Sequence, residues 1–207
     1  MERFIFDLDG TLLTNGFKKE REYFKEVFGE DGKRFFENAF KYLDDYEHQN
    51  INYDVHKLSE HLSRESGLNI TDSFVEGWIE VGANEIDTME EGVMETLEYL
   101  SLKGKDVIVL TNWFTKTQVA RLRKSKLIDY INEVHCGDTN LKPHRTTYLC
   151  ACGEYEPSDC IIIGDNIEKD YYEPQKYGLN AILYDKNDKH DKSLRKIKRI
   201  DEIKRMF

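Results

Sequence analysis

The stretch that decides the fold is Arg3-Phe4-Ile5-Phe6-Asp7-Leu8-Asp9-Gly10-Thr11, at the start of the 207-residue chain. Its first four residues form a short apolar run without alternation, as expected of a strand covered on both faces of a parallel sheet. Two carboxylates, Asp7 and Asp9, follow where the chain leaves that strand, and Gly10 permits a tight turn. Ligands of open α/β sheets bind beyond the carboxyl ends of the strands. The stretch therefore predicts a central strand and the edge that carries a site.

The second half of the chain alternates between strand-like and helix-like segments. Buried strands are predicted at 106–110, 159–163 and 180–184, with a weaker one at 133–136. Helices are expected over about 88–104, 115–127, 145–152 and 168–177, where apolar residues recur at helical spacing. This alternation is typical of a doubly wound α/β fold with a mostly parallel sheet. Capping boxes, Thr88 with Glu91 and Thr115 with Gln118, are predicted to start the first two helices.

The segment from about 17 to 86 has a different character. It lacks strand-like runs, and its aromatic and aliphatic residues form stripes at helical spacing. Gly29, Gly32 and Gly67 are expected to separate its helices, and Ser73 with Glu76 to cap the last one. The sequence thus predicts a core domain made of residues 1–16 and 87–207, with a helical cap domain of residues 17–86 inserted into it.

Composition excludes several classes of protein. The formal net charge of −10 and the pI near 5.2 give no global field that would attract a nucleic acid. No stretch has the length of a transmembrane helix, and the N-terminus meets acidic residues too early for a signal peptide, so a cytoplasmic location is expected. The four cysteines lack metal or redox spacing and are expected to be buried, reduced thiols.

Polar residues also follow the other predicted strands. Thr111-Asn112 ends the second strand, Gly164-Asp165-Asn166 ends the third with Asp170 five residues beyond Asp165, and Lys142 lies in the loop before the third. With Asp7 and Asp9, four carboxylates then gather at one edge of the sheet, where their mutual repulsion requires a cation. An all-oxygen ligand set favours Mg²⁺.

These residues resemble the four motifs of the haloacid dehalogenase superfamily, in the family's order and on the expected elements. Asp7-Leu8-Asp9-Gly10-Thr11 is similar to the first motif, DxDGT, and Leu110-Thr111-Asn112 to the second. Lys142-Pro143 resembles the third, and the run from Gly164 to Asp170 resembles the fourth, GDxxxxD. The inserted helical segment resembles the C1 cap of the family's phosphatases. One departure is His144, since an acidic residue that orients the lysine often follows Lys-Pro in capped relatives.

The resemblance implies a role for each matched residue. Asp7 would be the nucleophile that forms an aspartyl-phosphate, and Asp9 the general acid and base. Thr111, Asn112 and Lys142 would bind the phosphoryl group, with Thr111 and Lys142 also counted as catalytic. Asp7, Asp9, Asp165 and Asp170 would form the magnesium site, Asp9 through its backbone carbonyl.

The function expected is therefore Mg²⁺-dependent hydrolysis of a small phosphorylated metabolite, such as a sugar phosphate, phosphoglycolate or a nucleoside monophosphate, by a monomer or homodimer. Two alternatives stay open. A sugar phosphomutase retains both Asp7 and Asp9, and a non-catalytic binding module could keep the same fold. A dehalogenase is disfavoured because its chemistry needs no acid two residues after the nucleophile.

Overall fold

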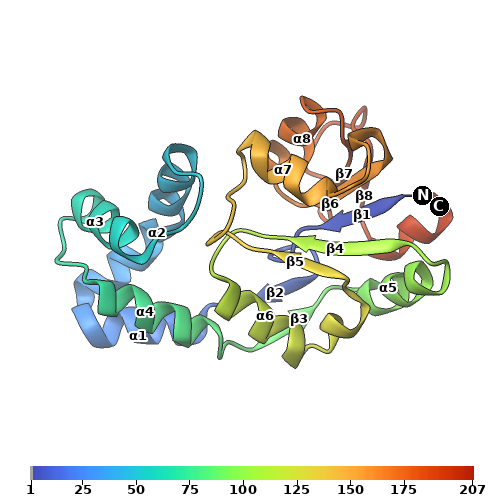
Figure 1. The fold of residues 1–207 in the computed structure, drawn as a ribbon. Coiled ribbons are helices and arrows are strands. Elements are labelled where there is room, and N and C mark those ends of the chain that lie inside the picture. The colour runs from blue at the N-terminus through green and yellow to red at the C-terminus, as the bar shows by residue number, and fades with distance from the viewer. Residues whose placement is uncertain (1) are drawn as a thin grey trace.

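The protein is described from a computed structural model, which covers residues 2–207. Its centre is a six-stranded, wholly parallel sheet in the order β5-β4-β1-β6-β7-β8 (Figure 1). The predicted doubly wound α/β architecture is confirmed. The strands are β1 (Arg3–Phe6), β4 (Asp106–Leu110), β5 (Glu133–His135), β6 (Cys160–Gly164), β7 (Asn180–Tyr184) and β8 (Lys196–Ile197). The last is too short and polar to be recognised from its sequence.

Both faces of β1 are covered, which explains its unbroken apolar run. Phe4 and Phe6 belong to a core cluster with α5 (Val93–Leu102), α6 (Thr115–Lys124) and the 3₁₀ helix η4 (Ile200–Arg205). Ile5 belongs to the cluster on the opposite face, under α7 (Arg145–Cys152). Side chains of a strand alternate between faces, so successive β1 residues supply both cores. Further short helical turns are η1 (Leu127–Tyr130) and η2 (Pro157–Asp159).

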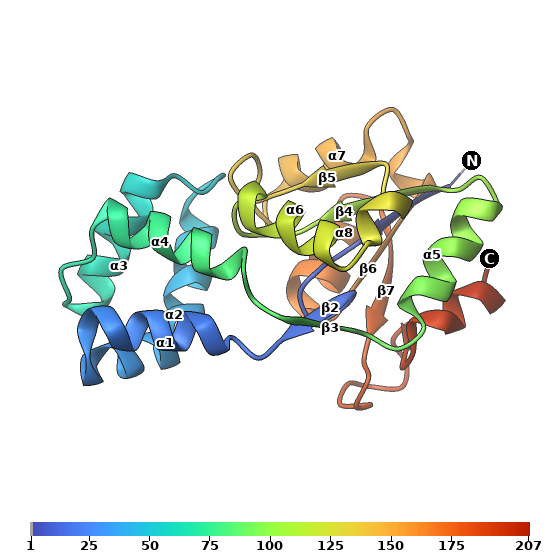
Figure 2. The same ribbon diagram turned by 90° about the horizontal axis from the view of Figure 1, so that it is seen from below.

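A two-stranded antiparallel ribbon joins the sheet to the helical segment, and the sequence did not predict it. It pairs β2 (Leu13–Asn15) with β3 (Asp87–Met89), and Figure 2 shows it beside the sheet, with the chain running from it to the helical segment. The predicted capping box at Thr88 is therefore wrong, because Thr88 lies in β3 and α5 begins only after Gly92. The second box is wrong as well, since α6 starts after Phe114 without a side-chain cap.

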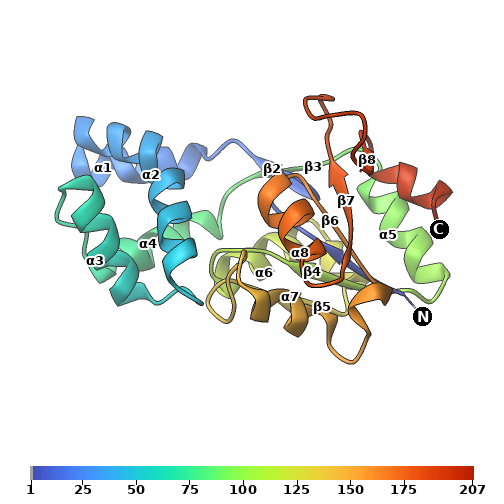
Figure 3. The same cartoon turned by 90° about the horizontal axis from the view of Figure 1, so that it is seen from above.

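The cap consists of four helices, α1 (Lys18–Phe28), α2 (Glu30–Gln49), α3 (Val55–Ser66) and α4 (Asp72–Gly82). They lie beyond one end of the sheet, while both chain termini lie at the other end (Figures 1 and 3). Thr71 rather than Ser73 caps α4. Gly32 does not interrupt a helix: a Cβ there would lie 2.0 Å from the Phe24 carbonyl oxygen, so glycine lets α1 and α2 approach closely. The proposed division at residues 17 and 86 remains a prediction.

The segment after β6 is less regular than predicted. Instead of one α-helix over 168–177, it forms a π-helix, η3 (Ile167–Tyr172), followed by the short α8 (Glu173–Gln175). Asn166 caps this segment by accepting hydrogen bonds from the Glu168 and Lys169 backbone N–H groups. Single π turns recur at functional sites because they re-aim side chains. Here the wider turn carries Lys169 and Asp170.

The prediction that the cysteines are buried thiols is correct for three of the four. Cys136, Cys152 and Cys160 are buried and unbridged, whereas Cys150, expected to be buried, is exposed. Within residues 2–207, no helix has both the length and the apolarity needed to cross a bilayer.

Candidate active site

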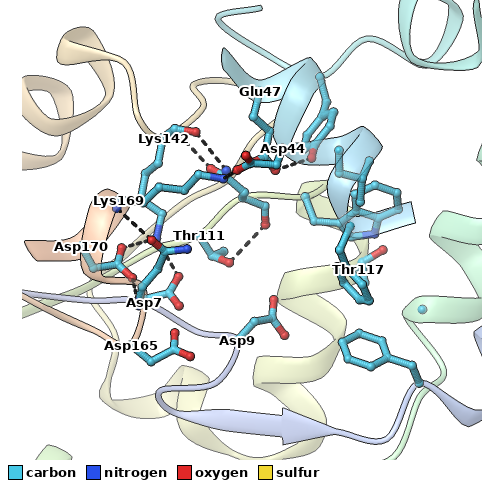
Figure 4. A pocket seen from close by; sticks show the side chains of 18 of the residues that line it. Asp7, Asp9, Asp44, Glu47, Thr111, Thr117, Lys142, Asp165, Lys169 and Asp170 are labelled. Atoms are coloured by element: carbon cyan, nitrogen blue, oxygen red, sulfur yellow. Dashed lines mark hydrogen bonds and ion pairs between the residues drawn. The ribbon is translucent and has the colours of Figure 1, made fainter. Parts of the chain in front are cut away.

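Three carboxylates converge at the carboxyl end of the sheet. Asp7 follows β1, Asp165 follows β6, and Asp170 comes from η3; one oxygen from each lies within 4.8 Å of the others. Figure 4 shows the three side by side at one end of a pocket. Asp7 is 6% exposed and Asp170 is fully buried. Gly10 has φ +81°, and a Cβ there would lie 2.4 Å from an Asp165 oxygen, so the DxDGT turn leaves room for that carboxylate.

Lys142 lies between two of these acids. Its Nζ donates to Asp7 Oδ1 at 2.8 Å and to Asp170 Oδ1 at 2.7 Å, and the side chain is buried. Burial alone lowers the pKa of Lys142, but the Asp170 and Asp7 carboxylates outweigh it and raise that pKa above its ordinary value. Asp170 thus supplies the orienting carboxylate that His144 could not. The His144 imidazole instead contacts the Glu47 backbone carbonyl in the cap at 2.7 Å.

The pKa values of Asp7 and Asp165 are raised because these acids are desolvated and lie close to other carboxylates. Burial, with the neighbouring Asp170 and Asp165 charges, holds the pKa of Asp7 well above its usual range, although Lys142 opposes the shift. Burial and the Asp170 charge raise the pKa of Asp165 to about 6. A hard divalent cation fits this arrangement, because carboxylate oxygens suit Mg²⁺ and its charge would relieve their repulsion.

Asp9 is held by two residues of α6. Arg121 pairs with Asp9 Oδ1 at 2.6 Å, and Gln118 Nε2 donates to Asp9 Oδ2 at 2.8 Å. Arg121 also pairs with Asp87 at 2.7 Å, and Asp87 lies in β3 of the connecting ribbon. A single buried guanidinium therefore links Asp9 to the ribbon that joins core and cap.

Thr111 and Asn112 line the same cavity. Thr111 Oγ1 accepts a hydrogen bond from Gln118 Nε2 at 3.0 Å. The Asn112 side chain is committed elsewhere: it accepts from the Lys142 backbone N–H at 2.9 Å and donates to the Lys142 carbonyl at 3.1 Å. This reciprocal pair joins two loops and fixes the backbone that carries Lys142. The structure thus gives the Asn112 side chain a positioning contact; phosphate binding by this residue stays a prediction.

The cavity between core and cap has a volume of about 570 Å³, within the range of small-molecule sites. On its cap side, Asp44 and Glu47 of α2 pair with Lys169 of η3, at 2.5 and 2.6 Å. Figure 4 shows these acids across the pocket from Asp7. Trp113 lines the cavity, with its ring 4.5 Å from that of Trp78 in α4.

A haloacid dehalogenase-like hydrolase family model matches residues 1–172. The chain belongs to the haloacid dehalogenase-like hydrolases. Its resemblance to that family, and its nature as a hydrolase, are thereby confirmed.

Relatives of this HAD-like hydrolase agree with that assignment. A ribulose-1,5-bisphosphate 5-phosphatase from Halopiger xanaduensis is 29% identical over 101 residues, which are 47% of this chain and 42% of that protein. The aligned region thus spans less than half of the curated relative.

Solved structures support the fold. A HAD hydrolase from Bacillus subtilis, bound to magnesium, has a TM-score of 0.71 and 16% identity, covering 99% of this chain and 97% of that one. The L-2-haloacid dehalogenase of Xanthobacter autotrophicus has a TM-score of 0.75 and 12% identity, covering 100% and 98%. A HAD phosphatase from Thermococcus onnurineus has a TM-score of 0.68 and 19% identity, covering 100% and 97%.

All residues predicted for the site of this HAD-like hydrolase line the cavity between core and cap: Asp7, Asp9, Thr111, Asn112, Lys142, Asp165 and Asp170. Sequence reasoning missed Gln118 and Arg121 as site residues, because it read Gln118 as part of a capping box and Arg121 only as part of a helix. Their spacing of three residues places both on one face of α6, and two polar groups on a face turned toward the core were the available signal. Glu20, Asp44, Glu47 and Lys169 gave no comparable signal, because charged residues in helices usually face solvent.

Proposed function

We propose that this hydrolase is a Mg²⁺-dependent phosphatase that cleaves a small phosphomonoester through an aspartyl-phosphate on Asp7. The observation that carries the proposal is the buried contact of Asp7 with Lys142, beside Asp165 and Asp170 and at the end of the cavity between core and cap. The phosphatase among its relatives supports the reaction class.

The cation would be held by carboxylate oxygens of Asp7, Asp165 and Asp170, together with the Asp9 backbone carbonyl. Bound Mg²⁺ would neutralise negative charge on the phosphoryl oxygens and on the nucleophile, which otherwise repel each other. Lys142 adds a second positive charge at Asp7 from the protein itself. Phosphoryl transfer depends mainly on such positioning and charge stabilisation.

The reaction then divides into two displacements. An Asp7 oxygen attacks phosphorus, the bond to the leaving oxygen breaks, and Asp9 gives that oxygen a proton. Water next attacks the phosphorus of the aspartyl-phosphate, Asp9 accepts its proton, and inorganic phosphate leaves with Asp7 restored. Arg121 and Gln118 hold the Asp9 carboxylate in place for both steps. Thr111 donates to a phosphoryl oxygen from its buried position.

The position of the cap over the site supports a metabolite rather than a phosphoprotein as substrate. The cap touches the core at several points around the cavity, including the His144 to Glu47 and Lys169 to Glu47 contacts. A lid of this kind must cover the whole substrate and exclude water from the reacting centre.

The test is phosphate release from an aryl phosphate and a panel of metabolite phosphates, with Mg²⁺ or with EDTA. We expect release with Mg²⁺ only, and none from Asp7→Asn. Asp159→Asn, on the exposed turn before β6, is the matched control and should retain full activity. Isomerised sugar phosphate without free phosphate would point to a mutase, and no turnover by folded, Mg²⁺-loaded protein would refute the proposal.

A further inference from the structure

The cap's share of the cavity wall is acidic and aromatic. It contributes five aromatic rings and three carboxylates, those of Glu20, Asp44 and Glu47. Among the cavity-lining residues that the structure describes, the cap supplies no Lys, Arg or His. Because the cap lies opposite the phosphate-binding edge, this wall faces whatever the phosphate is attached to.

Every lining side chain with a permanent positive charge belongs to the core and is already paired. Arg121 binds Asp9 and Asp87, Lys142 binds Asp7 and Asp170, and Lys169 binds Asp44 and Glu47. His190, an imidazole from the loop after β7, is the remaining basic group in the described wall. A second anionic group on the substrate would therefore face carboxylates without an uncommitted Lys or Arg to neutralise it.

Glu20 offers an unused acceptor. This α1 residue is 6% exposed and lines the cavity. Its Oε1 accepts from the Trp78 indole N–H at 3.0 Å, but Oε2 has no hydrogen-bond partner among residues 2–207. Buried carboxyl oxygens are rarely left unsatisfied, so such an atom at a cavity wall indicates where a ligand donor belongs. Burial also raises the pKa of Glu20 to about 7, against the Trp78 hydrogen bond.

We propose that the cap selects a phosphomonoester with a single anionic group, whose other end is uncharged or cationic and presents an N–H or O–H donor to Glu20. The aromatic rings around it would cover an apolar or planar part of the same leaving group. This inference rests on the proposed phosphatase activity and specifies its substrate class. It distinguishes the chain from the ribulose-1,5-bisphosphate 5-phosphatase among its relatives, whose substrate carries a second phosphate.

Three matched probes test this selection on one scaffold: phenyl phosphates with a para aminomethyl, hydroxymethyl or carboxylate group. Ribulose 5-phosphate and ribulose 1,5-bisphosphate form a second pair. We expect kcat/KM for the aminomethyl and hydroxymethyl probes to exceed that of the carboxylate probe by roughly a hundredfold, because a carboxylate placed against the cap's carboxylates meets like-charge repulsion. In the second pair, kcat/KM for ribulose 5-phosphate should likewise exceed kcat/KM for ribulose 1,5-bisphosphate.

At pH 8, where Glu20 is ionised, Glu20→Gln should reduce that ratio to a few-fold, since it removes the charge but keeps the acceptor for Trp78. Glu26→Gln, on the exposed face of the same helix, should leave the ratio unchanged. Asp44→Asn weakens the pairing of Lys169 and should raise kcat/KM for the carboxylate probe several-fold, a gain that misfolding cannot produce. Preference for the carboxylate probe or the bisphosphate, with Asp7-dependent turnover, overturns this inference alone. Absence of Asp7-dependent turnover on every probe refutes the phosphatase proposal itself.

Discussion

Arg121 contacts Asp9 at 2.6 Å and, through the other end of its guanidinium, Asp87 at 2.7 Å. Asp9 follows the central strand, whereas Asp87 lies in the ribbon through which the chain returns from the cap. The proposed acid and the connection to the cap therefore share one buried cation. A shift of the ribbon would move Arg121, and with it the carboxylate that we propose gives and takes protons. We therefore expect cap position and proton transfer to be coupled.

Replacing Arg121 should harm proton transfer more than substrate binding. In Arg121→Met we expect kcat to fall by about 10- to 100-fold, less than the roughly 10²–10⁴-fold that the general acid itself contributes, with a smaller change in KM. The loss should be larger for an alkyl phosphate than for 4-nitrophenyl phosphate, because a good leaving group needs little protonation. Arg123→Met, exposed on the same helix, is the control. Equal losses on both substrates would contradict a role at Asp9.

Replacing Lys142 should destabilise the protein as well as inactivate it. Lys142→Met leaves Asp7 and Asp170 buried without their shared cation, and breaking such a buried pair costs about 3–5 kcal/mol. Urea unfolding without Mg²⁺ measures this. Lys18→Met, which removes an exposed pair with Glu22, should change the free energy of unfolding by less than about 1 kcal/mol. Similar effects of the two substitutions would mean that Lys142 carries no structural charge.

Magnesium should stabilise the folded protein through the acidic cluster. At a Mg²⁺ concentration about 100 times its Kd, binding adds about 2.7 kcal/mol, which raises Tm by roughly 5–10 °C in a chain of this size. Asp165→Asn should lose most of that rise, and Asp159→Asn should keep it. Thermal unfolding with Mg²⁺ or EDTA is the measurement. An equal rise in both variants would place the cation elsewhere.

Glu20 should make stability fall as pH increases. Burial raises its pKa from 4.5 to about 7, with Glu85 and Asp9 acting in the same direction and Trp78 and Arg121 opposing it. A carboxyl whose pKa is raised by folding binds more protons in the folded state, so its contribution is present below pH 4.5 and lost as pH rises through 7. We expect Glu20→Gln to gain roughly 2–3 kcal/mol relative to wild type between pH 4.5 and 8. Parallel pH profiles of the two proteins would contradict this.

The sequence predicted the sheet and the site for the same physical reason. Residues of β1, β4, β6 and β7 are covered on both faces, so their apolar runs are unbroken and readable, and the site follows directly at their ends. The ribbon was not predicted because β2 and β3 have three residues each, which is too short for a strand-like alternation of side chains to be recognised. Thr88 was instead read as a cap.

The cap wall lay beyond sequence reasoning because its polar residues act through tertiary contacts. Glu20 has the local pattern of any helical glutamate, and its burial depends on Trp78, which is 58 positions away. Lys169 was passed over inside the fourth motif, although the π turn directs it to Asp44 and Glu47. Packing within the cap creates the Glu20–Trp78 contact, and docking of the cap on the core creates the two Lys169 pairs.

The most direct test of the account is to trap the covalent intermediate. Asp9→Asn should still accept a phosphoryl group from 4-nitrophenyl phosphate, whose leaving group needs no acid, but should hydrolyse the aspartyl-phosphate slowly because its base is missing. After a brief reaction with Mg²⁺ and an acid quench, peptide mass spectrometry should find one phosphoryl group on Asp7 of this variant, and none when Asp7 is also replaced by Asn. A phosphoryl group on any other residue, or rapid turnover by Asp9→Asn with no modified peptide, would contradict Asp7 as the nucleophile.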